Sequence, residues 1–169
     1  LALGQLKSQL ALEPLIEKLQ ADEVGDVRRS AAVALGALRS PDAFLPIITA
    51  LHDTNIDVQH AAVGALGRLG NRQAIPFLVS MLPIAPWHIR ETTAKSLQML
   101  GWQPDNSEPA AYYYMVGRQW TSCAALGQTA VPPLLSVLAD LQLARFHVRA
   151  IWTLGQIGDP QALPVLVDA

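Results

Sequence analysis

The sequence predicts an all-α fold, a right-handed superhelix of antiparallel helix pairs with a period of about 31 residues. The first observation behind this prediction is a repeated helix end, in which a leucine is followed by glycine in four of five copies. The second is composition, because 51% of the residues are hydrophobic and only 15% are charged, so many positions must be buried between repeats. The copies of this helix end begin at Leu3, Leu35, Leu66, Leu97 and Leu154.

The first helix of each repeat is expected to start near a proline. Proline is tolerated there because the amides of the first helical turn have no intrahelical acceptor. The residues that follow are apolar at spacings that place them on one side of a helix. These prolines are Pro14, Pro46, Pro76, Pro133 and Pro164.

The second helix of each repeat carries apolar residues on one face, as at Val27, Ala31 and Leu35. Small residues in the middle of this face allow neighbouring helices to approach closely, so we expect the glycine after each leucine to serve packing rather than ligand binding. Asp26 and Asp57 are expected to be the N-caps of two second helices. Short connections between the two helices of a repeat predict that they run antiparallel.

Extra sequence interrupts the period at about residues 101–128. It contains a polar, proline-bounded link at 103–109, followed by two apolar segments, of which the second begins at Trp120. We expect two short helices here, a shrunken repeat rather than a long loop. Residues 1–169 are therefore expected to form one continuous array, with partial repeats at both ends because the chain is a piece of a longer one.

Composition also limits the classes of function. A net charge of −2 argues against a nucleic-acid-binding surface. No apolar run approaches the roughly 20 residues of a membrane-spanning helix, so no membrane insertion is expected. The single cysteine, Cys123, is expected to be a buried thiol and fits a reducing compartment, which favours a cytoplasmic protein.

Sequence motifs for metal binding and catalysis are missing. The four histidines do not lie within a helical turn of one another, whereas a zinc site needs three or four converging ligands. The chain has neither a Gly-x-Ser-x-Gly motif nor a glycine-rich phosphate-binding loop with lysine. We therefore expect no metal, no cofactor and no catalytic residue.

A ladder of polar residues follows the first apolar residue of each second helix. One interpretation is that these side chains bond loop carbonyls or acidic residues of adjoining turns and fix the stacking of repeats. The other is that they line a concave surface that binds a protein partner, which would be extended by Arg29, His60, His88, Arg145 and Arg149. The ladder consists of Arg28, Gln59, Arg90 and His147.

Three consecutive tyrosines in the insert are the second candidate for partner contact. Neighbouring residues on a helix are about 100° apart, so at least one of the three should be exposed, and we assign Tyr112 and Tyr114 to the partner surface. The alternative is that aromatic residues of the insert, with Tyr113 and Trp120 among them, fill the irregular joint between unequal repeats.

The repeat pattern resembles the HEAT-like repeats of the phycobilin lyase (PBS lyase) type. The resemblance implies a HEAT/armadillo-like superhelix, and it is weaker for function because such scaffolds serve unrelated roles. We expect a non-catalytic scaffold that binds a protein partner. The alternative that the resemblance implies is a bilin lyase subunit or a bilin-handling chaperone for phycobiliproteins, in which Arg and Tyr side chains would meet propionates and pyrroles. The residues that carry the resemblance are Leu15-Ile16, Val27-Arg28, Ala34-Leu35-Gly36 and 150–159.

Overall fold

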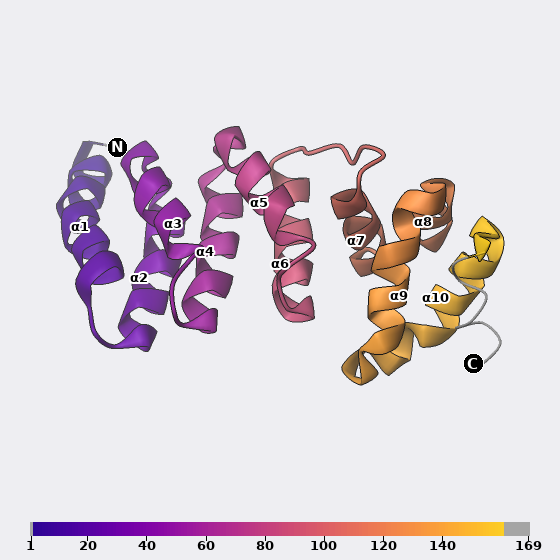
Figure 1. The fold of residues 1–169 in the computed structure, drawn as a ribbon. Coiled ribbons are helices and arrows are strands. Elements are labelled where there is room, and N and C mark those ends of the chain that lie inside the picture. Colours follow the sequence, from indigo (N-terminus) through magenta and orange to yellow (C-terminus); the bar gives the residue numbers. More distant parts are fainter. Residues whose placement is uncertain (1, 161–169) are drawn as a thin grey trace. The chain divides into compact units, whose positions relative to one another are not determined.

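The computed structural model describes residues 2–160, which contain ten α-helices and no β-strand (Figure 1). Short 3₁₀ turns precede α3, α5, α9 and α10, and several of the predicted prolines lie in the first turns of their helices. The predicted all-α class of paired helices is confirmed. The α-helices are α1 (Ala2–Ala21), α2 (Gly25–Leu38), α3 (Phe44–Ala50), α4 (Ile56–Leu69), α5 (Ile75–Met81), α6 (Trp87–Met99), α7 (Glu108–Val116), α8 (Trp120–Ala125), α9 (Val131–Ala139) and α10 (Ala144–Ile157).

The described residues form two compact units. In the first unit, residues 2–81 and 86–102, the second helices α2, α4 and α6 pack in succession, and α3 and α5 pack on α4 and α6. In the second unit, residues 82–85 and 103–160, α10 packs on α8 and α9, and α7 packs on α8. That all repeats form a single continuous array stays a prediction.

Close helix contacts explain the glycines of the first unit. A Cβ added to Gly36 would lie 2.6 Å from the Cα of Ala65, and one added to Gly67 would lie 2.6 Å from the Oγ of Ser96. Residues that approach this closely leave no room for a side chain. The prediction that these two glycines serve packing is confirmed.

The predicted N-caps are wrong by about two residues. Asn55 caps α4, because its side chain accepts a hydrogen bond from the amide of Asp57, and Val24 precedes α2 without a side-chain cap. Asp26 and Asp57 lie in the first turns of these helices instead. A carboxylate there still interacts favourably with the positive end of the helix dipole, which explains the acidic residue without a capping bond.

The insert folds as expected into two short helices, α7 and α8. Met115 and Cys123 are completely buried between these helices and their neighbours, and burial raises the pKa of the Cys123 thiol to about 12. No described helix is both long and apolar enough to span a bilayer.

Candidate functional site

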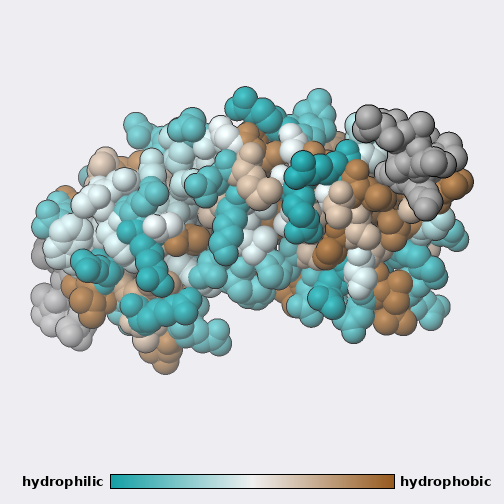
Figure 2. Space-filling view, turned by 180° about the vertical axis from the view of Figure 1, so that it is seen from behind, coloured by the Kyte–Doolittle hydropathy of each residue, from teal (hydrophilic) through white to brown (hydrophobic). Residues whose placement is uncertain are grey.

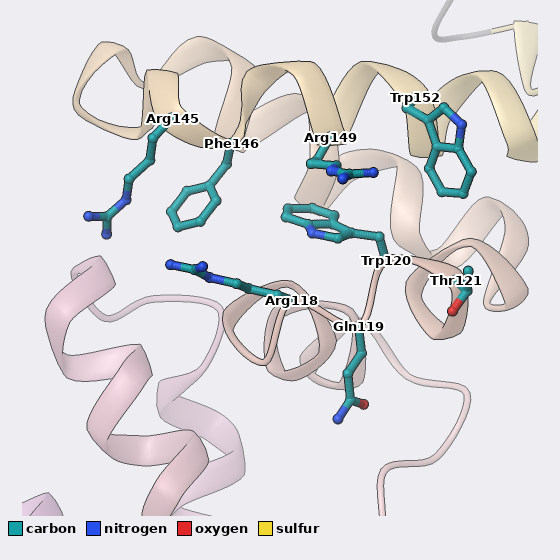
Figure 3. Close-up of a pocket in the computed structure, with 8 residues that line it drawn as sticks. All are labelled: Arg118, Gln119, Trp120, Thr121, Arg145, Phe146, Arg149 and Trp152. Atoms are coloured by element: carbon teal, nitrogen blue, oxygen red, sulfur yellow. The ribbon is translucent and has the colours of Figure 1, made fainter.

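The candidate site is a pocket of about 540 Å³ in the second unit (Figure 3). One wall comes from α10, and the other comes from the turn between α7 and α8 and from the start of α8 (Figure 3). Most of the labelled side chains reach into the space between these walls, whereas Gln119 points away from the others (Figure 3). The lining residues are Arg118, Gln119, Trp120, Thr121, Arg145, Phe146, Arg149 and Trp152.

Aromatic rings form the apolar part of the pocket. Trp120 on α8 and Phe146 on α10 are both buried, and their ring centroids lie 6.1 Å apart with the rings tilted by 46°. Trp152, six residues further along α10 than Phe146, is 41% exposed. A flat ligand could therefore contact a fixed apolar wall and an accessible indole.

Arginine is the only charged residue type among the described residues that line the pocket. The guanidinium of Arg145 lies over the ring of Phe146, with its central carbon 4.7 Å from the ring centroid. Arg118 and Arg149 are exposed, and neither forms an ion pair with a carboxylate in the part of the chain that the structure describes. The pocket thus combines aromatic walls with positive charge, a combination suited to a conjugated anion.

Two local structures place these arginines. On α10, Arg145, Arg149 and Trp152 are spaced by four and three residues, so they share one face of the helix. The chain reverses after α7 through hydrogen bonds from Arg118 N to Met115 O (3.0 Å) and from Gln119 N to Tyr114 O (2.8 Å). Arg118 takes the left-handed conformation in this turn, with φ of 56°.

Arg28, the first residue of the predicted ladder, is engaged within the chain. Its Nε and Nη2 donate to the two carboxylate oxygens of Asp53, each at 2.8 Å, and its Nη1 donates to the carbonyl of Asp22 at 2.9 Å. The hydrogen bond from Arg28 holds the pKa of Asp53 below its usual value. This geometry agrees with the structural interpretation of the ladder.

Two other ladder residues bond the turn before their own helix in the same way. Gln59 Nε2 donates to the carbonyl of Asp53 at 2.7 Å, and His147 Nε2 lies 3.1 Å from the carbonyl of Asp140. Arg90 is half-buried on α6. At Arg28, Gln59 and His147 the ladder therefore joins a second helix to the turn that precedes it.

The remaining predicted residues of the first unit lie along α2, α4 and α6. His60 Nε2 lies 2.6 Å from Thr92 Oγ1, and the His60 and His88 rings meet edge to face at 5.6 Å. Burial lowers the pKa of His60, and the neighbouring His88 lowers it further. Arg29 is half exposed and lies 3.6 Å from the carboxylate of Asp26, a weak surface pair.

The tyrosines differ from what we expected. Tyr112 is only 5% exposed, and its hydroxyl lies 3.5 Å from Ser136 Oγ on α9. Tyr113 and Tyr114 are half-buried, with their rings edge to face at 5.9 Å. Burial makes Tyr112 a packing residue, so its assignment to a partner surface is corrected, whereas Tyr114 stays a candidate.

Of the residues that the sequence assigned to a partner surface, Arg145 and Arg149 lie in the pocket. Sequence reasoning placed Trp120 in a structural role and missed Arg118 and Trp152. A signal for α10 was present, because Arg149 and Trp152 occupy the repeat positions that Ser30 and Val33 hold in α2. No repeat comparison could have found Arg118, since it lies in the insert. Elsewhere in the described residues, no group of three or more His, Cys, Asp and Glu side chains could hold a metal ion.

Comparison with known proteins gives two family matches. The model of HEAT repeats matches residues 12–98 and 44–118, and the model of the PBS lyase HEAT-like repeat matches residues 147–169. The phycocyanobilin lyase subunit alpha of Nostoc sp. is 29% identical over 167 residues, which cover 94% of this chain and 55% of that protein.

Two further relatives carry the same name. The phycocyanobilin lyase subunit alpha of Synechococcus elongatus is 38% identical over 88 residues, or 48% of this chain and 32% of the relative. That of Microchaete diplosiphon is 36% identical over 93 residues, or 50% of this chain and 31% of the relative. The chain spans about half the length, or less, of these relatives.

Proposed function

The chain belongs to the HEAT-repeat family, and we propose that it handles a bilin as part of a lyase-type subunit. The observation that carries this proposal is the pocket between α8 and α10, in which arginines and aromatic rings line the same space. A bilin is a linear tetrapyrrole, an extended conjugated molecule that carries carboxylates. The names of the three relatives point to the same class of ligand.

The pocket residues divide the work of binding. Trp120 and Phe146 form a fixed wall because both are buried, so contact with the conjugated face of a bilin needs no reordering of side chains. The indole of Trp152 is exposed, so it can cover the ligand on the solvent side. In this proposal the chain binds and orients the bilin, and an acceptor phycobiliprotein receives it.

The test is an absorbance titration of the full chain with phycocyanobilin. We expect a saturable change in the visible spectrum of the bilin, because a bound tetrapyrrole is held in a narrower range of conformations than a free one. The variant Trp152→Ala should bind the bilin more weakly. Stacking of a flat conjugated ring on an aromatic side chain contributes about 1–3 kcal/mol to binding. An unchanged spectrum with the wild-type chain would refute the proposal.

The matched control is Phe77→Ala in the first unit. Phe77 is 43% exposed, close to the 41% of Trp152, but it lies on α5 and lines no part of the pocket. It should leave bilin binding unchanged. A second readout is the transfer of bound bilin to an apophycobiliprotein, which Trp152→Ala should slow.

A protein-binding surface is the second proposal, and it belongs to the first unit. Large apolar side chains are exposed there, among them Val33 (43%), Leu45 (71%) and Phe77. On the face shown in Figure 2, hydrophobic residues form separate patches between hydrophilic ones. A transient protein contact surface is about as apolar as the rest of a protein surface, so separate patches of this kind are compatible with such a contact. Arg29 and His88, which the sequence assigned to a partner, are also exposed in this unit.

The two proposals can be separated by the same pair of variants. Capture of a purified phycobiliprotein by the immobilised chain should fall with Phe77→Ala, because Phe77 belongs to the proposed surface, and unchanged capture would contradict the second proposal. Trp152→Ala should weaken bilin binding and leave the capture of the phycobiliprotein unchanged. Loss of both properties in both variants would show general unfolding, which circular dichroism would detect directly.

A further inference from the structure

We infer that the pocket recognises two carboxylates of one ligand, one at Arg118 and one at Arg149. The ligand class is then a conjugated dicarboxylic acid with both acids free, as opposed to an ester or a monoacid. This inference rests on the proposed function and makes it more specific, because it names the chemical groups that are read and the residues that read them.

The three pocket arginines are not equivalent. Arg145 lies over the Phe146 ring and extends the wall that this ring forms. Arg118 and Arg149 come from opposite walls of the pocket, one from the turn after α7 and the other from α10 (Figure 3). A guanidinium pairs best with one carboxylate through two parallel hydrogen bonds. Two cations on two walls therefore match two separate carboxylates better than one shared group.

Packing between repeats does not require an arginine at position 149. The corresponding positions of the other second helices carry Ser30, Ala61 and Thr92, all small residues. The residues next to position 149 still pack as in the other second helices, since Ala150 and Leu154 are completely buried. Arg149 is thus an addition to a surface position of an unchanged helix, which favours a role in binding.

Arg118 lies at a position where glycine would be less strained. The left-handed conformation costs a non-glycine residue stability, and the preceding residue, Gly117, does not take it. Helices α4, α6 and α10 are followed by Gly70, Gly101 and Gly158 in this conformation. Arg39 after α2 shares the strain of Arg118 without lining the pocket, so it serves as the matched control for Arg118.

The experiment compares two forms of one probe. The full chain and its variants Arg118→Gly, Arg149→Gln and Arg39→Gly are titrated with phycocyanobilin and with phycocyanobilin dimethyl ester, and both absorbance and tryptophan fluorescence are followed. The wild-type chain should bind the diacid about a hundredfold more tightly than the diester, since the diester loses two charged hydrogen-bonded pairs and each pair contributes enough for about a tenfold change.

The variants then assign the carboxylates. Arg118→Gly and Arg149→Gln should each weaken binding of the diacid about tenfold and leave binding of the diester unchanged. Arg39→Gly should change neither. Arg118→Gly should be at least as stable as the wild-type chain in thermal unfolding, because glycine adopts this conformation freely, so a loss of binding in this variant cannot come from unfolding.

The outcomes separate this inference from the proposed function. Equal affinity for diacid and diester would overturn the two-carboxylate inference and leave bilin binding intact. The same holds if the arginine variants weaken both forms alike. If the wild-type chain binds neither form, the proposed function fails and this inference fails with it.

Discussion

Helices α2 and α10 have the same buried framework and different outer residues. Ala31 and Leu35 of α2 correspond to Ala150 and Leu154 of α10, and all four are buried. Where α2 carries Asp26, Ser30 and Val33, α10 carries Arg145, Arg149 and Trp152. The comparison teaches that the buried positions maintain the repeat, whereas the outer positions are free to form a pocket.

The arginines of the two units show the same division. The guanidinium of Arg28 in the first unit donates hydrogen bonds to the carboxylate of Asp53 and to the backbone carbonyl of Asp22, and 14% of the Arg28 side chain is exposed. Arg149 in the second unit is exposed in the pocket. Residue type alone therefore does not separate a structural arginine from a binding one, but the partners that the fold supplies do.

The largest effect on stability is expected from filling a close contact between second helices. Gly36→Ala places a Cβ 2.6 Å from the Ala65 backbone, so the helices must move apart, at a loss of about 1–3 kcal/mol in the free energy of unfolding. Gly155→Ala, at the same repeat position of α10, meets no described atom within 4 Å and should stabilise the helix by up to about 1 kcal/mol. Chemical denaturation measures the free energy of unfolding of both variants. Equal changes in Gly36→Ala and Gly155→Ala would show that the two positions do not differ in packing.

The second effect is the loss of a structural arginine. Arg28→Ala removes the hydrogen bonds to Asp53 and Asp22 and should lower the melting temperature clearly, whereas Arg149→Ala should leave it close to that of the wild-type chain. Arg28→Lys should restore little stability, because an ammonium group cannot make the two parallel bonds to Asp53. Equal melting temperatures for Arg28→Ala and Arg149→Ala would contradict this division.

A smaller effect is expected from the strained turn. Arg118→Gly relieves a left-handed φ of 56° and should raise the free energy of unfolding by about 1 kcal/mol. Arg39→Gly, with φ of 54°, should give a similar gain. Thermal unfolding of both variants tests whether the turn of the pocket and the turn after α2 carry the same strain. A loss of stability in Arg118→Gly alone would show that its side chain supports the fold.

The smallest expected effect is a change in how the stability of the chain depends on pH, and it comes from His60 in the first unit. Burial and the neighbouring His88 lower the pKa of His60 from 6.5, so the folded chain binds a proton at His60 less readily than the unfolded chain does. The stability that this group contributes is therefore fully present above about pH 6.5 and is lost as the pH falls through that value and through the lower folded pKa. Urea midpoints at about pH 7.5 and 5.5 should differ more for the wild-type chain than for His60→Gln. If the urea midpoint shifts by the same amount between the two pH values in the wild-type chain and in His60→Gln, this role of His60 is contradicted.

The fold could be predicted from the sequence because its buried positions repeat. The spacing of Leu35, Leu66 and Leu97 identifies helices that pack in succession, and the sequence of the insert separates α7 from α8. Arg28 could be placed only as one of two alternatives, because its distance to Asp53 depends on how two turns lie side by side. Most of the pocket escaped prediction, since its two walls come from an insert and from outer positions that follow no period.

Cys123 has a consequence for how a bilin would leave this protein. It is the only cysteine of the 169 residues, and it is completely buried with its thiol pKa raised to about 12. A thiol in that state supplies almost no nucleophilic sulfur at neutral pH. Under the function proposed above, these residues therefore offer a bilin no thioether anchor of their own.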